Sequence, residues 1–125
     1  MNHMKTTLTP TINPANMGFT LSFPNGLDLS VRYGHMSYCD MYNADIKCQN
    51  DIDEHISTTN VEIAVYSRLN NEFVWLPDQV LGYVKLHHLS AIINHVSTSN
   101  KDAFLAVLAD YFTQEKTEIS VDTAL

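Results

Sequence analysis

The chain has 125 residues, 45% of them hydrophobic, and 7 basic residues face 14 acidic ones for a net charge of −7. This composition predicts one globular domain over 1–125, and the negative charge argues against DNA, RNA or an anionic membrane as a partner. No apolar run approaches the ~20 residues of a membrane-spanning helix. Because the N-terminus is polar and does not resemble a secretory signal, we expect a cytoplasmic protein.

The first regular elements predicted are two strands, MGFTLSF at 17–23 and LDLSVRY at 27–33. Both alternate strictly between apolar and polar residues, which is typical of strands with one buried face. A three-residue loop, with Gly26 in the left-handed region, pairs Phe19 with Val31 and keeps every apolar side chain on one side of the hairpin.

A second hairpin is predicted from VEIAVYSRL at 61–69 and EFVWL at 72–76. Alternation directs one set of its side chains inward: Val61, Ile63, Val65 and Leu69. The other set points outward: Glu62, Ala64, Tyr66 and Arg68.

Two helices are predicted after this hairpin. In the segment 83–98, apolar residues recur at helical spacing: Leu86, Leu89, Ile92, Ile93 and Val96. Ser99 or Asn100 caps a second helix, whose apolar stripe is Phe104, Leu105, Val107, Leu108, Tyr111 and Phe112. We expect a long loop at 40–60 and flexible ends at 1–14 and 114–125.

Strands followed by helices indicate an α+β fold. We therefore expect an antiparallel four-stranded sheet, built from the two hairpins, with both C-terminal helices packed on one face. Alternation leaves the other face to polar side chains: Thr20, Ser22, Ser30, Arg32, Glu62, Tyr66 and Arg68.

This polar face is the first candidate site. Arg32 and Arg68 are the only arginines in the chain, and guanidinium groups bind phosphate through a fork of donors. Tyr66 could stack on a base, and Ser30 could donate a hydrogen bond. The alternative is an ordinary solvated face on which Arg68 pairs with a carboxylate such as Glu62.

The second candidate is the segment YGHMSYC at 33–39. Either Gly34 allows a sharp exit and Tyr38 and Cys39 anchor the strand in the core, or His35 and Tyr38 line the rim of a pocket.

Metal and catalytic sites are poorly supported. His35, Cys39, Cys48 and His55 are zinc-type ligands, but their spacing matches no standard zinc site. His87, His88 and His95 fit packed or exposed histidines. A Cys39–His35 thiolate pair has no evident third group. We therefore expect no enzyme, no cofactor and no bound metal.

Three stretches, FPNGLDLSVRYGHMSYC, VEIAVYSRLNNEFVWL and VLGYVKLHHLSAIINHV, resemble a family of small accessory proteins of tailed bacteriophages. The resemblance covers about residues 19 to 96, and the long insert and second helix depart from it. The matching positions are Asn25, Gly26, Ser30, Gly34, Tyr38, Cys39, Glu62, Ile63, Ala64, Val65 and Tyr83.

The resemblance implies an anti-defence protein in the host cytoplasm that sequesters a nucleotide-type immune signal without cleaving it. Arg32 and Arg68 would meet phosphate, while His35 and Ser30 would complete the site. A homo-oligomer would wrap the ligand, and the stacking residue would be Tyr33, Tyr38, Tyr66 or Trp75. The alternatives are an inhibitor of a host defence protein, acting through Asp51, Asp53 and Glu54, and a structural phage component.

Overall fold

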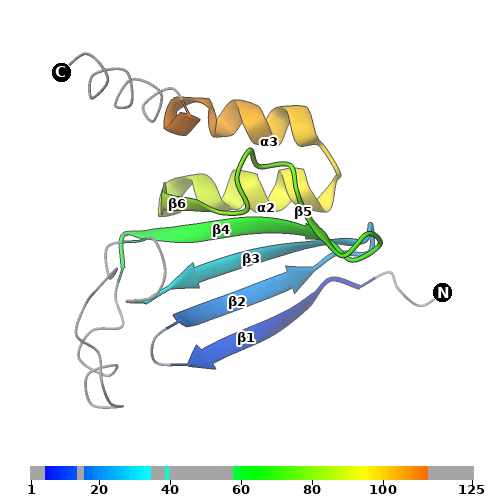
Figure 1. Cartoon of the computed structure of the whole chain (residues 1–125), viewed down its shortest axis with the longest axis horizontal. Helices are drawn as coiled ribbons and strands as arrows, with labels where there is room; N and C mark the ends of the chain where they lie inside the picture. The colour runs from blue at the N-terminus through cyan, green and yellow to red at the C-terminus, as the bar shows by residue number, and fades with distance from the viewer. Residues whose placement is uncertain (1–4, 14–15, 35–38, 40–57, 113–125) are drawn as a thin grey trace.

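The computed structural model describes residues 5–13, 16–34, 39 and 58–112. Its elements confirm an α+β fold in which an antiparallel sheet precedes the helices (Figure 1). The strands are β1 (Thr7–Asn13), β2 (Asn16–Ser22), β3 (Leu27–Tyr33), β4 (Asn60–Ser67), β5 (Glu72–Val74) and β6 (Leu81–Lys85). A 3₁₀ helix, η1 (Leu86–His88), leads into α2 (Leu89–Ser97) and α3 (Lys101–Val107).

The sheet has six strands where four were predicted. Its order is β1-β2-β3-β4-β5, and β6 also pairs with β4. The additional strand β1 lies in the segment expected to be flexible, so that expectation is wrong for Thr7–Asn13. Thr and apolar residues alternate there, but Pro10 weakens the strand pattern. The proline is accommodated because β1 lies at the edge of the sheet, where a strand tolerates a missing N–H.

Strand β6 replaces the start of the predicted first helix. Two residues, Gly82 and Tyr83, lie between the Leu81 and Val84 pairing positions and face the single residue Glu62 on β4. Such a bulge breaks the two-residue period of a strand. Because this period is broken, the sequence pattern did not indicate a strand, and the predicted helix was extended over this stretch. The regular helix α2 therefore begins only at Leu89.

The β2–β3 hairpin has the predicted register. Phe19 faces Val31, the Gly26 N–H donates to the Phe23 carbonyl at 3.1 Å, and Gly26 has a φ of +91°. In the second hairpin the inward position predicted for Leu69 is wrong. β4 ends at Ser67, and Leu69 lies in the following turn with 88% of its surface exposed.

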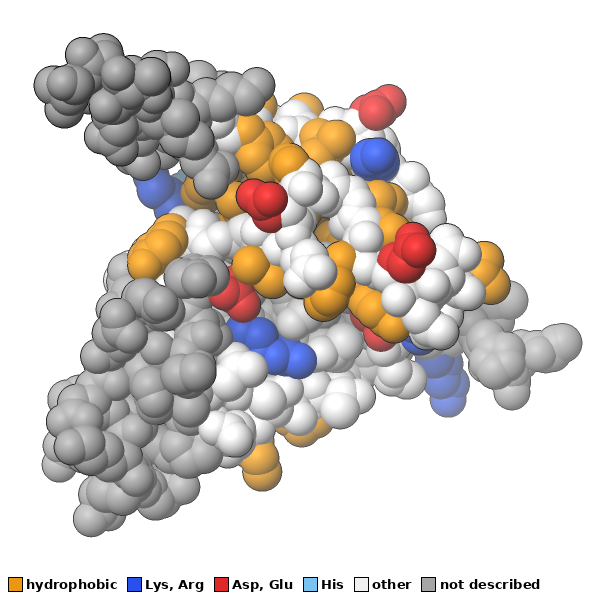
Figure 2. Space-filling model, viewed as in Figure 1, with side chains coloured by type: hydrophobic (Ala, Val, Ile, Leu, Met, Phe, Trp, Pro, Cys, Tyr) orange, Lys and Arg blue, Asp and Glu red, His pale blue; other side chains and the backbone are white. Residues whose placement is uncertain are grey.

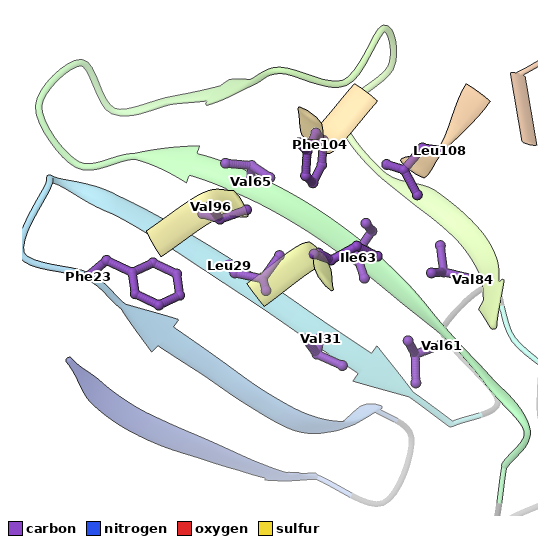
Figure 3. Close-up of a cluster of buried hydrophobic side chains, with 11 residues drawn as sticks. Phe23, Leu29, Val31, Val61, Ile63, Val65, Val84, Val96, Phe104 and Leu108 are labelled. Atoms are coloured by element: carbon purple, nitrogen blue, oxygen red, sulfur yellow. The ribbon is translucent and has the colours of Figure 1, made fainter. Parts of the chain in front are cut away.

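The hydrophobic core lies between the sheet and the helices (Figure 3). α2 contributes Ile92 and Val96, and α3 contributes Phe104. They pack with buried side chains of the strands and the neighbouring turns: Phe23, Leu29, Val31, Val61, Ile63, Val65, Val84 and Leu108. No helix within the described ranges is long and apolar enough to cross a membrane.

Two asparagines fix the ends of the helices. The Asn100 side chain caps α3 by accepting from the Ala103 N–H at 3.1 Å, which confirms one of the two predicted caps. The Asn25 amide, in the β2–β3 turn, donates to the Val96 carbonyl and to Ser99 Oγ, both at 2.8 Å. Asn25 thus connects the hairpin turn to the C-terminal end of α2.

We expect the Asn25→Ala substitution to lower the free energy of unfolding by about 1–3 kcal/mol, because it removes the hydrogen bonds that join the β2–β3 turn to Val96 and Ser99. Urea denaturation measures the change. Asn70→Ala, at an exposed position in the β4–β5 turn, is the matched control and should change stability by less than about 0.5 kcal/mol. Equal effects of the two variants would contradict this role of Asn25.

Candidate functional site

The sheet face opposite the helices is polar and rich in hydroxyl groups. The strand register aligns its side chains in rows across the sheet. The view of Figure 2 shows largely uncharged surface over β1 to β3, with a basic and an acidic side chain next to each other. The rows are Thr9–Thr20–Ser30–Ala64, Thr11–Gly18–Arg32–Glu62 and Thr7–Ser22–Asp28–Tyr66–Phe73. The predicted polar face therefore exists and is extended by the threonines of β1.

Arg32 lies on this face, but its guanidinium forms hydrogen bonds mainly within the sheet itself. Nη1 donates to the carbonyls of Phe19 at 2.7 Å and Val31 at 3.1 Å. Nη2 donates to Thr20 Oγ1 at 2.9 Å. Partial burial lowers the pKa of Arg32, and the nearby Glu62 carboxylate opposes this shift. The half-buried Arg32 side chain thus connects β2 and β3 by hydrogen bonds.

Gly18 makes room for the β3 backbone next to Arg32. It lies directly opposite Arg32 with a φ of +132°, in the region that side chains rarely adopt. A Cβ atom at this position would overlap the Val31 carbonyl oxygen, a rigid backbone atom. The geometry of the β2–β3 pair at this point therefore requires glycine.

Arg68 lies just beyond the end of β4 and binds the β2–β3 turn. Its Nη1 donates to the Leu27 carbonyl at 3.1 Å, and its Nη2 donates to the Phe23 carbonyl at 2.7 Å. It forms an ion pair with Asp28, where the sequence suggested Glu62. The Arg68 side chain remains 40% exposed.

The two arginines do not share one site. Arg32 lies opposite Glu62, six positions before Arg68 along the same chain segment. At about 3.3 Å per residue, a strand separates the two arginine backbones by roughly 20 Å. A single phosphate group can contact one of them only.

Of the predicted aromatic contacts that the structure describes (Tyr33, Tyr66 and Trp75), Tyr66 alone lies on the polar face. Its ring meets Phe73 edge to face, with the centroids 5.6 Å apart, and its hydroxyl contacts Asn71 Oδ1 at 3.2 Å. Tyr33 and Trp75 instead pack against the core; the Trp75 ring lies 5.2 Å from that of Phe104. Alternation places Tyr33 on the helix side of the sheet, and a positive φ of 76° just beyond β5 accompanies the packing of Trp75 against the core.

A shallow hollow of about 390 Å³ lies between two turns at the Arg68 end of the sheet. Sequence reasoning missed it because its walls come from the β2–β3 and β4–β5 turns, which are distant in the chain. The only signal was the turn-forming stretch at 24–26. The lining residues are Pro24, Asn25, Gly26, Leu27, Ser67, Arg68 and Leu69.

Cys39 anchors the exit of β3. It is buried, and its Sγ lies 3.4 Å from the Gly34 nitrogen and 3.6 Å from the Gly34 oxygen. This supports the anchoring interpretation for Cys39. His35, Tyr38, Cys48 and His55 lie outside the described residues, and the remaining part holds no cluster of three or more potential metal ligands.

The His88 side chain connects the end of η1 to Tyr111, which follows α3. Its Nδ1 lies 2.8 Å from the Tyr111 hydroxyl, which also accepts from the Lys85 N–H at 2.8 Å. Burial lowers the pKa of His88, and the neighbouring His87 and Lys85 lower it further, whereas Asp110 raises it. The neutral ring, which can accept the Tyr111 hydrogen, is therefore the favoured form.

Comparison with known proteins finds no family model, no curated protein and no solved structure that matches this chain. The resemblance to phage accessory proteins stays a prediction.

We expect Gly18→Ala to destabilise the fold by more than about 3 kcal/mol, because a clash with rigid backbone adds to the positive φ. Gly26→Ala is the matched control: its φ is also positive, but nothing lies within 4 Å of the added Cβ atom. It should cost only about 1–2 kcal/mol. Urea denaturation of both variants tests this order, and the reverse order would refute it.

Protonation of His88 should destabilise the folded protein. Its pKa is lower in the folded state than the ordinary value of about 6.5, so its contribution is complete above that value and is lost as the pH falls through the folded pKa. Thermal or urea unfolding between pH 7.5 and pH 5 measures the loss. His88→Gln should reduce the loss of stability between pH 7.5 and pH 5, whereas His95→Gln should show the same loss as the unmodified protein. An unchanged dependence of stability on pH in His88→Gln would contradict the assignment to His88.

Proposed function

We propose that this chain is a non-catalytic binding protein that captures a small anionic, nucleotide-type ligand beside Arg68. The observation that carries the proposal is the hollow between the two turns, which has a partly exposed guanidinium in its wall. Its volume of about 390 Å³ falls within the range of small-molecule sites, roughly 300–1,000 Å³.

Arg68 retains donors for such a ligand. A guanidinium has five N–H groups, and three of them bond to Leu27, Asp28 and Phe23. Within the described residues this leaves two N–H groups for an anion. The turn carbonyls hold the side chain in place, so a ligand would meet an ordered donor group instead of a mobile one.

The surroundings of Arg68 favour a nucleotide over a bare inorganic anion. Tyr66 of β4 and the exposed Phe73 of β5 form an aromatic pair on the two strands that flank the turn containing Arg68. Base stacking on an aromatic ring contributes about 1–3 kcal/mol. The Asp28 carboxylate has the opposite effect, because it competes with any anion for Arg68.

The phage resemblance supplies the cellular context of this proposal: sequestration of an immune nucleotide signal in the host cytoplasm. Arg32 is set aside as a primary ligand contact because its guanidinium is engaged by the sheet. The alternative inhibitor hypothesis rests on Asp51, Asp53 and Glu54, which lie outside the described residues.

Isothermal titration with ADP-ribose, a cyclic dinucleotide and inorganic phosphate tests the proposal. We expect one of the nucleotides to bind and Arg68→Gln to weaken its binding by about 10-fold or more, because charge-assisted hydrogen bonds are lost. Asp28→Asn should strengthen binding by removing the competing charge.

Lys101→Gln is the matched control, since it also removes one exposed positive charge, at the start of α3, and should leave the affinity unchanged. Melting curves verify that each variant is folded. No binding by the unmodified protein, or equal binding by Arg68→Gln, would refute the proposed function.

A further inference from the structure

One Asn–Gly pair occurs in the chain, Asn25–Gly26, and it lies in the β2–β3 turn. Asparagine followed by glycine is prone to spontaneous deamidation, because the backbone nitrogen that attacks the side-chain amide has no neighbouring Cβ atom to hinder it. Only the chain itself and water take part in this reaction. The turn therefore contains a chemically reactive pair.

The reaction begins when the Gly26 nitrogen loses its proton and forms a bond with Asn25 Cγ. The bond between Cγ and Nδ2 then breaks, and Nδ2 takes up one proton and leaves as ammonia. Water opens the resulting cyclic imide at either of its two carbonyls. The product is aspartate or isoaspartate at position 25, so a neutral amide that donates hydrogen bonds becomes an anion that only accepts them.

Hydrogen bonds in the folded protein hold both reacting groups. The Gly26 N–H donates to the Phe23 carbonyl at 3.1 Å, so the attacking nitrogen keeps its proton inside the turn. Asn25 Nδ2 donates to the Val96 carbonyl and to Ser99 Oγ, both at 2.8 Å. The amide cannot rotate toward Gly26 without losing these two bonds.

One further hydrogen bond has two opposing effects. The Leu27 N–H donates to Asn25 Oδ1 at 3.1 Å, which polarises the amide carbonyl and by itself favours attack. The same bond also fixes the amide, because its oxygen is held by Leu27 while its nitrogen is held by the end of α2. Attack requires a particular approach of the nitrogen to the amide carbon, so the restriction outweighs the polarisation while the turn is closed.

We propose that Asn25 is a latent self-modification site, which the folded turn keeps unreactive and which opening of the turn activates. The bonds that protect the amide are the same bonds that join the turn to the end of α2. A local opening that separates the turn from α2 therefore exposes the Asn–Gly pair. This inference does not rest on the proposed ligand, because the reaction needs none.

The product cannot restore the contact with α2. A carboxylate at position 25 has no hydrogen to donate to the Val96 carbonyl. It would also lie at the C-terminal end of α2, where the helix dipole disfavours negative charge. Each conversion is therefore irreversible and leaves a turn that is less firmly held.

Peptide mapping by mass spectrometry tests the proposal on the whole protein, incubated at mildly alkaline pH with and without urea. The mass increase from amide to acid identifies the converted asparagine. We expect conversion of Asn25 to be at least about 10-fold slower in the folded protein than in urea, because reaction requires opening of the turn.

The Asn71→Gly variant supplies a matched control within the same molecule. It creates a second Asn–Gly pair at 70–71 in the exposed β4–β5 turn, and the φ of +56° at position 71 suits glycine. Among the described residues, the Asn70 side chain has no hydrogen-bond partner that could hold it. We expect Asn70 to react at least about 10-fold faster than Asn25 in the folded variant, and both to react at similar rates in urea.

Equal rates at Asn25 and Asn70 in the folded variant would show that the turn gives no protection. Absence of conversion at Asn25 in urea would show that the pair is not reactive. Either result would overturn the proposal.

The effect of the product is measured separately with the Asn25→Asp variant. We expect it to unfold at a lower urea concentration than the unmodified protein, because the donor to Val96 is lost. Asn70→Asp adds the same charge in the β4–β5 turn and should leave the midpoint unchanged. Equal midpoints for Asn25→Asp and the unmodified protein would refute the claim that conversion loosens the turn.

Discussion

The turn between β2 and β3 is the point on which the rest of the structure depends. Its three-residue loop sets the register that puts every apolar side chain of both strands on the helix side. Asn25 then ties the turn to the end of α2, and Arg68 ties it to the end of β4. One loop therefore aligns the sheet, orients the helix layer and forms one wall of the hollow.

Both arginines of the chain satisfy backbone carbonyls before any ligand is considered. Arg32 bridges β2 and β3 at the place where Gly18 distorts the strand, and its guanidinium is partly desolvated. Arg68 does the same for the turn, but it stays more accessible and borders an open hollow. The difference in exposure, rather than in residue type, is why Arg68 and not Arg32 is proposed as the ligand contact. A guanidinium already held by carbonyls loses little freedom when it binds an anion.

The two edges of the sheet differ in which strands flank them. β4 is flanked by β5 at one end and by β6 at the other, and β6 contains a bulge at Gly82 and Tyr83. β1 has no such neighbour among the described strands, and Pro10 with two exposed aliphatic side chains defines its surface. Pro10 thus protects this edge from strand pairing, while Leu8 and Ile12 leave its helix-side face apolar and exposed.

The sequence by itself determined the α+β class, the β2–β3 register and the polar face, and it limited the cap of the second helix to Ser99 or Asn100, because each follows from local alternation or from the chemistry of a few adjacent residues. It did not reveal β6, since the bulge hides the strand period, or β1, since Pro10 weakens it. Tertiary structure decided the position of Leu69, the pairing of Arg68 with Asp28 and the core position of Trp75. It also created the hollow, whose walls meet only when β3 pairs with β4. Contacts between distant segments depend on how the chain folds back on itself, and a local sequence pattern contains no information about those contacts.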